Sequence, residues 1–187
     1  MSATAQRRIN ATEFLAWAQS QEKGRYELFR GETFAMAPER AEHVAAKARI
    51  WRALADAIAH VGAPYEAFVD GLGVKIDDHT VYEPDALVNC GDPPVPADSL
   101  LAPAPIVIVE VISPSSRSFD KNSKLSDYFR LASVMHYLVV DLSRRLILHY
   151  RRQADQIVVA IVNEGRITLD PPGLNVAVDE IIPEIPA

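Results

Sequence analysis

The sequence predicts a mixed α/β (α+β) fold in which a central β-sheet is flanked by helices. An alanine-rich stretch over residues 40–60 carries apolar residues at the three- and four-residue spacing of an amphipathic helix. Residues 106–112 are almost wholly apolar, which is typical of a strand covered on both faces. The predicted order is a helix, a hairpin, a long helix, several strands, a helix and further strands, and this order favours a sheet with helices packed against it.

Length and composition favour one globular unit, and we expect a single domain over residues 1–187. Apolar residues make up 49% of the chain and charged residues 24%, as in an ordered globular protein. No apolar run approaches the roughly 18 residues of a membrane span, and the first eight residues lack the apolar segment of a secretory signal. The single cysteine, Cys90, excludes an internal disulfide framework and a cysteine-rich zinc site. We therefore expect a cytoplasmic protein with no membrane association.

The charge balance limits how the chain can bind nucleic acid. A net charge of -6 argues against a large nonspecific binding surface, which depends on lysine and arginine neutralising phosphates. The same charge is compatible with a nuclease, because a bound metal ion contributes positive charge at the site.

The N-terminal elements are a short helix and a β-hairpin. Asn10 is a suitable N-cap for a helix over residues 10–18. Residues 25–29 and 32–36 alternate polar and apolar side chains around Arg30 and Gly31, which predicts a hairpin.

The central elements follow from the same reasoning. The long helix over residues 40–60 is ended by Gly62 and Pro64. Strands are then predicted over residues 65–69, 72–76 and 84–90. Five prolines in residues 91–105 predict a loop without regular structure.

The remaining prediction is a strand, a helix and three strands. They are expected over residues 106–112, 120–132, 137–140, 146–150 and 157–161, with turns at 163–165 and 171–173.

Glu110 is the first candidate site residue, because it ends an apolar strand. With a period of two, Ile106, Ile108, Glu110 and Ile112 share one face of that strand. A carboxylate at such a position is costly unless a metal ion, a lysine or a hydrogen-bond network compensates it. The alternative is that Glu110 protrudes at the edge of the sheet.

Asp85 is the second candidate. If the strands over residues 84–90 and 106–112 are neighbours, Asp85 and Glu110 lie side by side. Two adjacent carboxylates repel each other, so a cation between them is the natural reason for such an arrangement. The alternative is an aspartate that caps its own turn.

Lys124 is the third candidate. It shares one face of the predicted helix with Asp120 and Tyr128, at i, i+4 spacing. The lysine is either part of an ordinary surface pair with Asp120 or an amine that stabilises negative charge near Glu110.

Asp120 and Tyr128 are accessory candidates, and so are three further residues. Glu27 and Glu32 flank the hairpin turn, and His43 lies at the start of the long helix. Each residue is more often an exposed charge or a polar cap than a ligand. At a helix N-terminus, His43 is also suited to a position beside a metal ion or a phosphate.

The chain resembles the Uma-two family of bacterial endonucleases, within the PD-(D/E)XK nuclease superfamily. The similarity extends over nearly the whole sequence, in order and at the usual spacing. The segments that carry it are Tyr26-Glu27-Leu28, Gly31-Glu32, Met36-Ala37-Pro38, His43, Glu83-Pro84-Asp85-Ala86-Leu87-Val88, Val109-Glu110-Val111-Ile112-Ser113-Pro114-Ser115-Ser116, Asp120, Lys124, Tyr128, His136-Tyr137-Leu138-Val139-Val140-Asp141 and Pro172-Gly173-Leu174.

The resemblance implies a restriction-endonuclease-like core and hydrolysis of DNA phosphodiesters that depends on Mg2+ (or Mn2+). Asp85 and Glu110 would be the metal-binding acids. The superfamily most often has a lysine two residues after the second acid, and here that position is Ile112. Lys124 matches the lysine of this family and would supply the amine from the following helix.

Two functional hypotheses follow. The first is a metal-dependent endonuclease, for which we expect a twofold homodimer because cutting both strands of a duplex usually needs two sites. The second is a catalytically degenerate module of the same fold that binds nucleic acid or a protein partner. The acidic net charge and Ile112 favour the second hypothesis.

Overall fold

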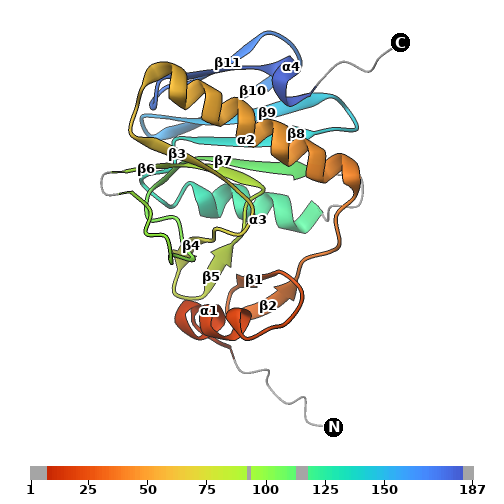
Figure 1. The fold of residues 1–187 in the computed structure, drawn as a ribbon, viewed down its shortest axis with the longest axis vertical. Helices are drawn as coiled ribbons and strands as arrows, with labels where there is room; N and C mark the ends of the chain where they lie inside the picture. Colours follow the sequence, from red (N-terminus) through yellow and green to blue (C-terminus); the bar gives the residue numbers. More distant parts are fainter. Residues whose placement is uncertain (1–7, 92–93, 113–117, 183–187) are drawn as a thin grey trace.

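A six-stranded mixed sheet is the centre of the fold (Figure 1). The computed structural model describes residues 8–91, 94–112 and 118–182, and for residues 118–122 it describes the backbone alone. The strands lie in the order β10-β9-β8-β7-β6-β3, with β7 and β8 parallel and the other neighbours antiparallel. Their bounds are β3 Tyr65–Val69, β6 Ala86–Cys90, β7 Pro105–Ile112, β8 His136–Asp141, β9 Leu146–Gln153 and β10 Gln156–Val162.

Two helices cover opposite faces of this sheet (Figure 1). Helix α2 (Ala41–Val61) packs Ile50 and Leu54 against Val107 and Val109 of β7. Helix α3 (Ser118–Tyr128) lies on the other face, where Tyr128 shares a core cluster with Ile108. Because alternate residues of a strand point to opposite faces, β7 contributes to both cores and is buried on both sides.

A smaller antiparallel sheet lies at the N-terminal end of the molecule, in the order β2-β1-β5-β4 (Figure 1). Its strands are β1 Tyr26–Phe29, β2 Glu32–Ala35, β4 Val74–Asp77 and β5 Thr80–Tyr82. Arg30 and Gly31 both have positive φ, of 52° and 83°, as the tight turn of a β1–β2 hairpin requires. Helix α1 (Ala11–Gln19) begins with the expected cap, because Asn10 and Glu13 exchange side-chain and backbone hydrogen bonds.

A third sheet, of two strands, and a short helix cover the core beside α2. They are β11 Arg166–Leu169, β12 Leu174–Ala177 and α4 Val178–Ile181. Ile167, Leu169 and Val176 are buried in the same cluster as the apolar face of α2. The sequence predicted only turns in this region, because four-residue strands are too short for their alternation to stand out.

The predicted class, a mixed sheet flanked by helices with an N-terminal helix and hairpin, is confirmed. Several local predictions were wrong. Strand β5 was not predicted, and helix α3 ends at Tyr128 and not at residue 132. Strand β6 begins at Ala86 and not at Pro84, so Asp85 precedes the strand. Ile106 packs in the α2-side core and not with Ile108, because a bulge opposite Val88 and Asn89 shifts the register of β7 by one residue.

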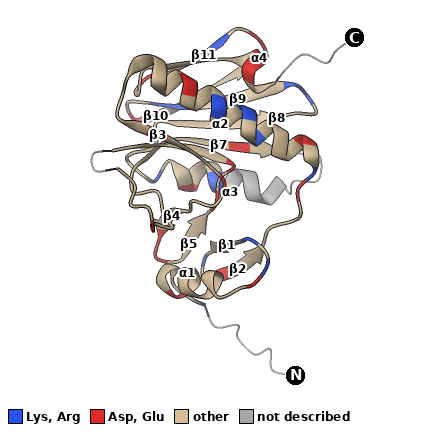
Figure 2. Ribbon diagram, viewed as in Figure 1, with Lys and Arg blue, Asp and Glu red and all other residues tan. Residues whose placement is uncertain are grey.

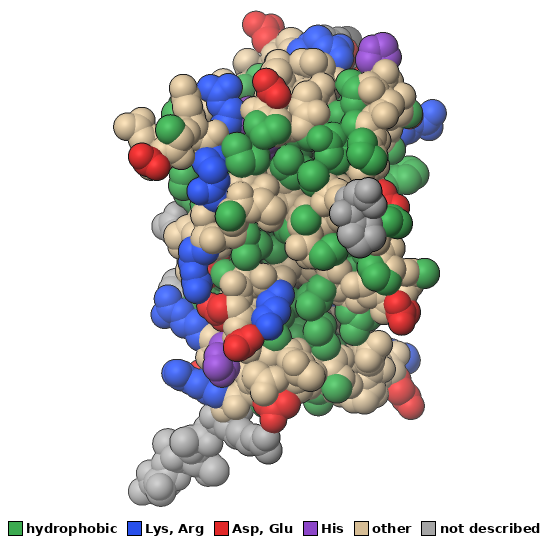
Figure 3. Space-filling model, turned by 90° about the vertical axis from the view of Figure 1, so that its left-hand side faces the viewer, with side chains coloured by type: hydrophobic (Ala, Val, Ile, Leu, Met, Phe, Trp, Pro, Cys, Tyr) green, Lys and Arg blue, Asp and Glu red, His purple; other side chains and the backbone are tan. Residues whose placement is uncertain are grey.

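The surface is unevenly charged. On the face in Figure 3, apolar side chains form a band through the middle, and most of the visible lysine and arginine side chains lie along the left-hand edge. Among the described residues, no helix is both long enough and apolar enough to cross a membrane.

Candidate active site

Asp85 lies immediately before β6 and is 5% exposed. Its Oδ2 accepts a hydrogen bond of 2.6 Å from the backbone N–H of Val111 in β7. Its Oδ1 lies 3.2 Å from Nε2 of His43 and 3.6 Å from Nζ of Lys47, both on α2. The alternative of a turn aspartate bound to its own backbone therefore does not describe Asp85, whose contacts are all long-range in sequence.

Glu110 lies near the end of β7, and its contacts come from α3. Its Oε1 accepts hydrogen bonds from Nζ of Lys124 at 3.1 Å and from the hydroxyl of Tyr128 at 2.8 Å. Lys124 and Tyr128 are one helical turn apart, so α3 presents both donors on the same face. The side chain of Glu110 is 13% exposed and does not protrude at the sheet edge.

The two acids meet where β6 begins and β7 ends. The β6–β7 ladder pairs Ala86 with Val109, so the next residues outward are Asp85 and Glu110. They take their charged partners from different helices, Asp85 from α2 and Glu110 from α3. In the ribbon coloured by charge, basic positions of α2 lie next to acidic positions at this end of the sheet (Figure 2).

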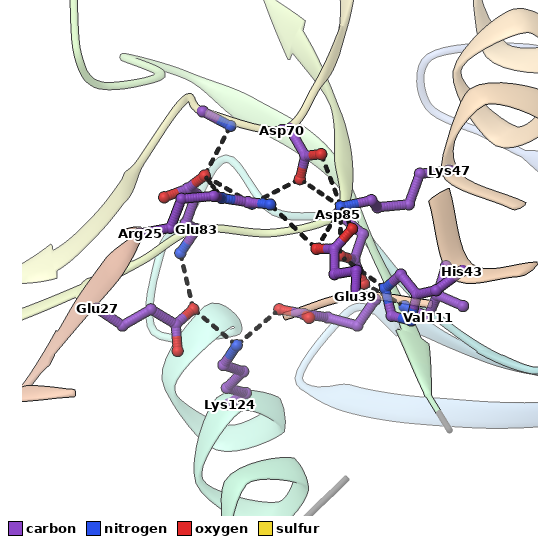
Figure 4. Close-up of polar contacts among 12 residues, drawn as sticks. Arg25, Glu27, Glu39, His43, Lys47, Asp70, Glu83, Asp85, Val111 and Lys124 are labelled. Carbon is purple, nitrogen blue, oxygen red and sulfur yellow. Dashed lines mark hydrogen bonds and ion pairs between the residues drawn. The ribbon is translucent and has the colours of Figure 1, made fainter. Parts of the chain in front are cut away.

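Lys124 joins Glu110 to the small sheet. Its Nζ lies 2.8 Å from Oε1 of Glu27 in β1, and it is 5% exposed overall. Glu27 also accepts a hydrogen bond of 2.9 Å from the backbone N–H of Glu83 (Figure 4). Lys124 is therefore not part of an ordinary surface pair.

The other predicted site residues divide into two groups. Tyr128 and His43 lie in the site through the contacts above, whereas Glu32 is exposed on β2 and takes no part in those contacts. The side chain of Asp120 lies outside the described residues. Ile112 packs beside the α3-side core and offers no polar group.

A ring of ion pairs lies beside Asp85, and sequence reasoning missed it. Nζ of Lys47 is 2.6 Å from Oε1 of Glu39 and 2.8 Å from Oδ1 of Asp70. Arg25 donates to Glu39, Asp70 and Glu83 at distances of 2.6–3.0 Å (Figure 4). Lys47 is 1% exposed although it is a lysine. One signal was available, because His43 and Lys47 lie four residues apart on one face of α2, and Glu39 precedes this helix at the same spacing.

The environment separates the two acids electrostatically. Burial, together with the negative charges of Asp85 and Glu27, raises the pKa of Glu110 to about 8 against the opposing effect of Lys124. Burial alone would also raise the pKa of Asp85, but the hydrogen bonds from His43 and the Val111 amide, with the charge of Lys47, lower it. The hydrogen bond to Asp85 raises the pKa of His43, against the opposing effect of burial. Near neutral pH, Asp85 is ionised, whereas Glu110 can hold a proton.

The residues of this site fit a divalent cation. Within the described ranges, ligand atoms of Glu39, His43 and Asp85 all lie within 4.8 Å of one another. The site also holds more acids than bases, a balance that favours binding of a cation. The acids are Glu27, Glu39, Asp70, Glu83, Asp85 and Glu110, and the bases that pair with them are Arg25, His43, Lys47 and Lys124. Carboxylate oxygens suit Mg2+ or Mn2+.

Comparison with known proteins identifies relatives of the whole chain. A crystal structure from Anabaena variabilis ATCC 29413, described as a "putative nuclease belonging to DUF820", has a TM-score of 0.72, with 16% identity over 92% of this chain and 97% of that chain. At this identity the likeness concerns the fold alone.

Two proteins of Synechocystis sp. are similar in sequence. Uncharacterized protein slr1290 is 26% identical over 93% of this chain and 91% of its own length. Uncharacterized protein sll1609 is 31% identical over 94 residues, which cover 49% of this chain and 53% of that protein, so this second match spans about half of each chain.

The model of the Uma2 family matches residues 11–179. This range contains the acids, the lysines and the histidine of the site. The chain therefore belongs to the Uma2 family, which is described as "Putative restriction endonuclease".

Proposed function

We propose that this protein is a metal-dependent endonuclease that hydrolyses phosphodiester bonds of DNA. The observation that carries the proposal is the meeting of Asp85 and Glu110 at one end of the sheet, with Lys124 bound to Glu110. Membership of the Uma2 family supports a nuclease and a DNA substrate.

Asp85 and Glu110 would hold the cation, and Glu39 and His43 offer further ligand atoms on the α2 side. When bound, Mg2+ (or Mn2+) supplies Lewis-acid activation of a water molecule and neutralises charge on the attacked phosphate. The protein prepares this site by fixing Asp85 on the backbone of β7 and Glu110 on Tyr128.

Lys124 is the group best placed to stabilise charge that develops on the phosphate. Its ammonium is held within the site by Glu27 and Glu110, at 2.8 and 3.1 Å, and is shielded from water. In such a surrounding, a fixed positive charge acts more strongly than it does in water. Ile112 carries no amine, so Lys124 would supply it instead, from α3, the helix that follows β7.

The proposal is tested by incubating supercoiled plasmid DNA with the purified protein and Mg2+ or Mn2+. We expect cleavage with either ion and none in EDTA. The test variant is Asp85→Asn, which removes a negative charge from the site. Its matched control is Glu32→Gln, which removes a negative charge from the exposed hairpin. Cleavage by Asp85→Asn at the rate of the unmodified protein contradicts the proposal.

The second candidate is a non-catalytic module that binds nucleic acid or a protein partner. Ile112 favours this candidate, as does Lys47, whose ammonium already lies 3.6 Å from Asp85. Titration with Mn2+ distinguishes the two, because a degenerate site filled by lysine binds no ion at Asp85 and Glu110.

A further inference from the structure

Strand β10 is an exposed apolar edge of the six-stranded sheet. It pairs with β9 on one side and ends the sheet on the other. Ile157, Val159 and Ile161 lie on one face of this strand and are 47%, 52% and 71% exposed. Val158, on the opposite face, is 38% exposed. Among the residues that the structure describes, none pairs with the free edge of β10, and side chains on both of its faces are exposed.

This edge lacks the features that normally prevent strands from pairing with other chains. Natural edge strands carry charged residues, proline or a β-bulge. Residues 156–162 contain no charged residue and no proline. The β9–β10 register runs unbroken through seven residue pairs, from Gln156 with Gln153 to Val162 with Ile147. An uncovered edge of this kind is an aggregation site, so we expect a partner to cover it.

The apolar surface continues from β10 onto β9. Val159 lies opposite Tyr150, and Ile161 lies opposite Leu148. Tyr150 and Leu148 are half-buried at the margin of the α3-side core. The surface therefore extends across two strands and is not a set of isolated side chains.

We infer that a second copy of this chain covers β10, by antiparallel pairing of the two β10 strands about a twofold axis at Val159. The argument is self-complementarity. In this register Val159 faces Val159 of the partner subunit, Ile157 faces Ile161 of the partner subunit, and Val158 faces Ala160 of the partner subunit. The five residues from Ile157 to Ile161 then all lie opposite apolar side chains, and Val162 lies opposite Gln156 of the partner subunit.

The ends of the strand are also compatible with this register. Asp155 faces Asn163 of the partner subunit, so no like charges lie directly opposite each other. A pairing of seven-residue strands is about 24 Å long. The area that such a contact buries is at the small end of the range for specific protein interfaces. We therefore expect a dimer that dissociates in the micromolar range.

The dimer has a consequence for the site, which rests on the proposed function. Seven strand spacings separate the β7 strand of one copy from that of the other, about 34 Å at roughly 4.8 Å per spacing. The two β7 strands run in opposite directions, so the two sites open at opposite ends of the twelve-stranded sheet. Each copy then cuts on its own, and we expect a supercoiled plasmid to become open circular before it becomes linear.

The dimer is tested without any assay of activity. Analytical ultracentrifugation over a range of protein concentrations should show a monomer–dimer equilibrium, and Val159→Lys should shift it to monomer by placing two lysines face to face. Val61→Lys makes the same change at an exposed valine at the end of α2 and should leave the equilibrium unchanged. Circular dichroism checks that both variants are folded.

Cross-linking tests the register. In a Cys90→Ser background, Val159→Cys should form a disulfide-linked dimer on oxidation, because the two thiols face each other. Ile157→Cys should not, because its two thiols are about 14 Å apart. A protein that stays monomeric, a dimer that survives Val159→Lys, or equal cross-linking of both cysteine variants overturns the inference. Loss of nicking in an intact dimer counts instead against the proposed function.

Discussion

The backbone N–H of Val111 donates a hydrogen bond of 2.6 Å to Oδ2 of Asp85. This bond joins the residue before β6 to the residue after Glu110, so the position of one acid is fixed by the backbone beside the other. The main-chain ladder, and not only the side-chain packing, therefore sets how the two acids lie relative to each other.

Replacing Asp85 by asparagine separates its charge from its structural role. Asparagine keeps an oxygen that can accept from Val111 but removes the negative charge. Loss of a group that merely orients a metal ligand costs 10- to 100-fold, so loss of the ligand charge should reduce cleavage by at least about 100-fold. Plasmid cleavage rates and a thermal melt check this prediction, and we expect the melting temperature to change little.

Replacing Lys124 by methionine keeps the side-chain length and removes the ammonium. We expect cleavage to fall by about 100-fold, the effect of losing one group that stabilises charge in the transition state. Mn2+ affinity, measured by isothermal titration calorimetry, should be retained because both acids remain. The control is Lys75→Met, at an exposed lysine on β4, and equal loss of rate in both variants would contradict the assigned role.

Lys47→Met tests the ring of ion pairs beside Asp85. The variant leaves Glu39, Asp70 and Asp85 without the buried ammonium that they share. Removing one partner of a buried pair typically costs about 3–5 kcal/mol, and because Asp70 is partly exposed we expect a loss of about 3 kcal/mol. Urea denaturation measures it. Arg52→Met, which breaks an exposed pair with Asp56, should cost under about 0.5 kcal/mol.

A buried histidine pair makes stability depend on pH. Nδ1 of His136 lies 2.9 Å from Nε2 of His149, and Nε2 of His136 donates to the carbonyl of Pro171. Burial lowers the pKa of each imidazole from 6.5 to about 4, because it disfavours the charged form. The folded protein therefore binds fewer protons than the unfolded chain between these values, and stability falls as the pH falls from 6.5 to 4.

The size of this effect follows from the shift. An imidazole whose pKa is lowered from 6.5 to about 4 stabilises the folded protein by on the order of 3 kcal/mol. This stabilisation is fully present above pH 6.5. Chemical denaturation at pH 7 and pH 4.5 measures the loss. His149→Gln should flatten the profile, and an unchanged profile in that variant would exclude the pair as its cause.

Cation binding should also depend on pH, but at higher pH than the effect of the histidine pair. Because the pKa of Glu110 is raised to about 8, the acid is partly protonated at neutral pH and must lose its proton to bind an ion. Apparent Mn2+ affinity should therefore rise between pH 6.5 and pH 8.5, by up to about tenfold per unit below the pKa. Calorimetric titration at several pH values measures this rise, and Glu110→Gln should remove it together with most of the affinity.

The sequence predicted the features that depend on local patterns. The period of α2 and the apolar run of β7 are repeated over enough residues to be recognised, and Glu110 is conspicuous because it interrupts such a run. Asp85 is a candidate because its predicted strand can lie beside the strand of Glu110, and the chain-wide resemblance links both acids to Lys124. The hairpin of β11 and β12 escaped prediction because each of its strands has only four residues.

Only the tertiary structure decided how the charges are shared. Lys124 pairs with Glu27 across 97 positions of the chain, and Arg25 reaches Glu83 across 58. Periodicity describes which face of its own element a residue occupies, but not which distant element packs against that face. Lys47 illustrates the limit: the sequence places a lysine on a helix, and folding buries it among carboxylates that come from three separate segments.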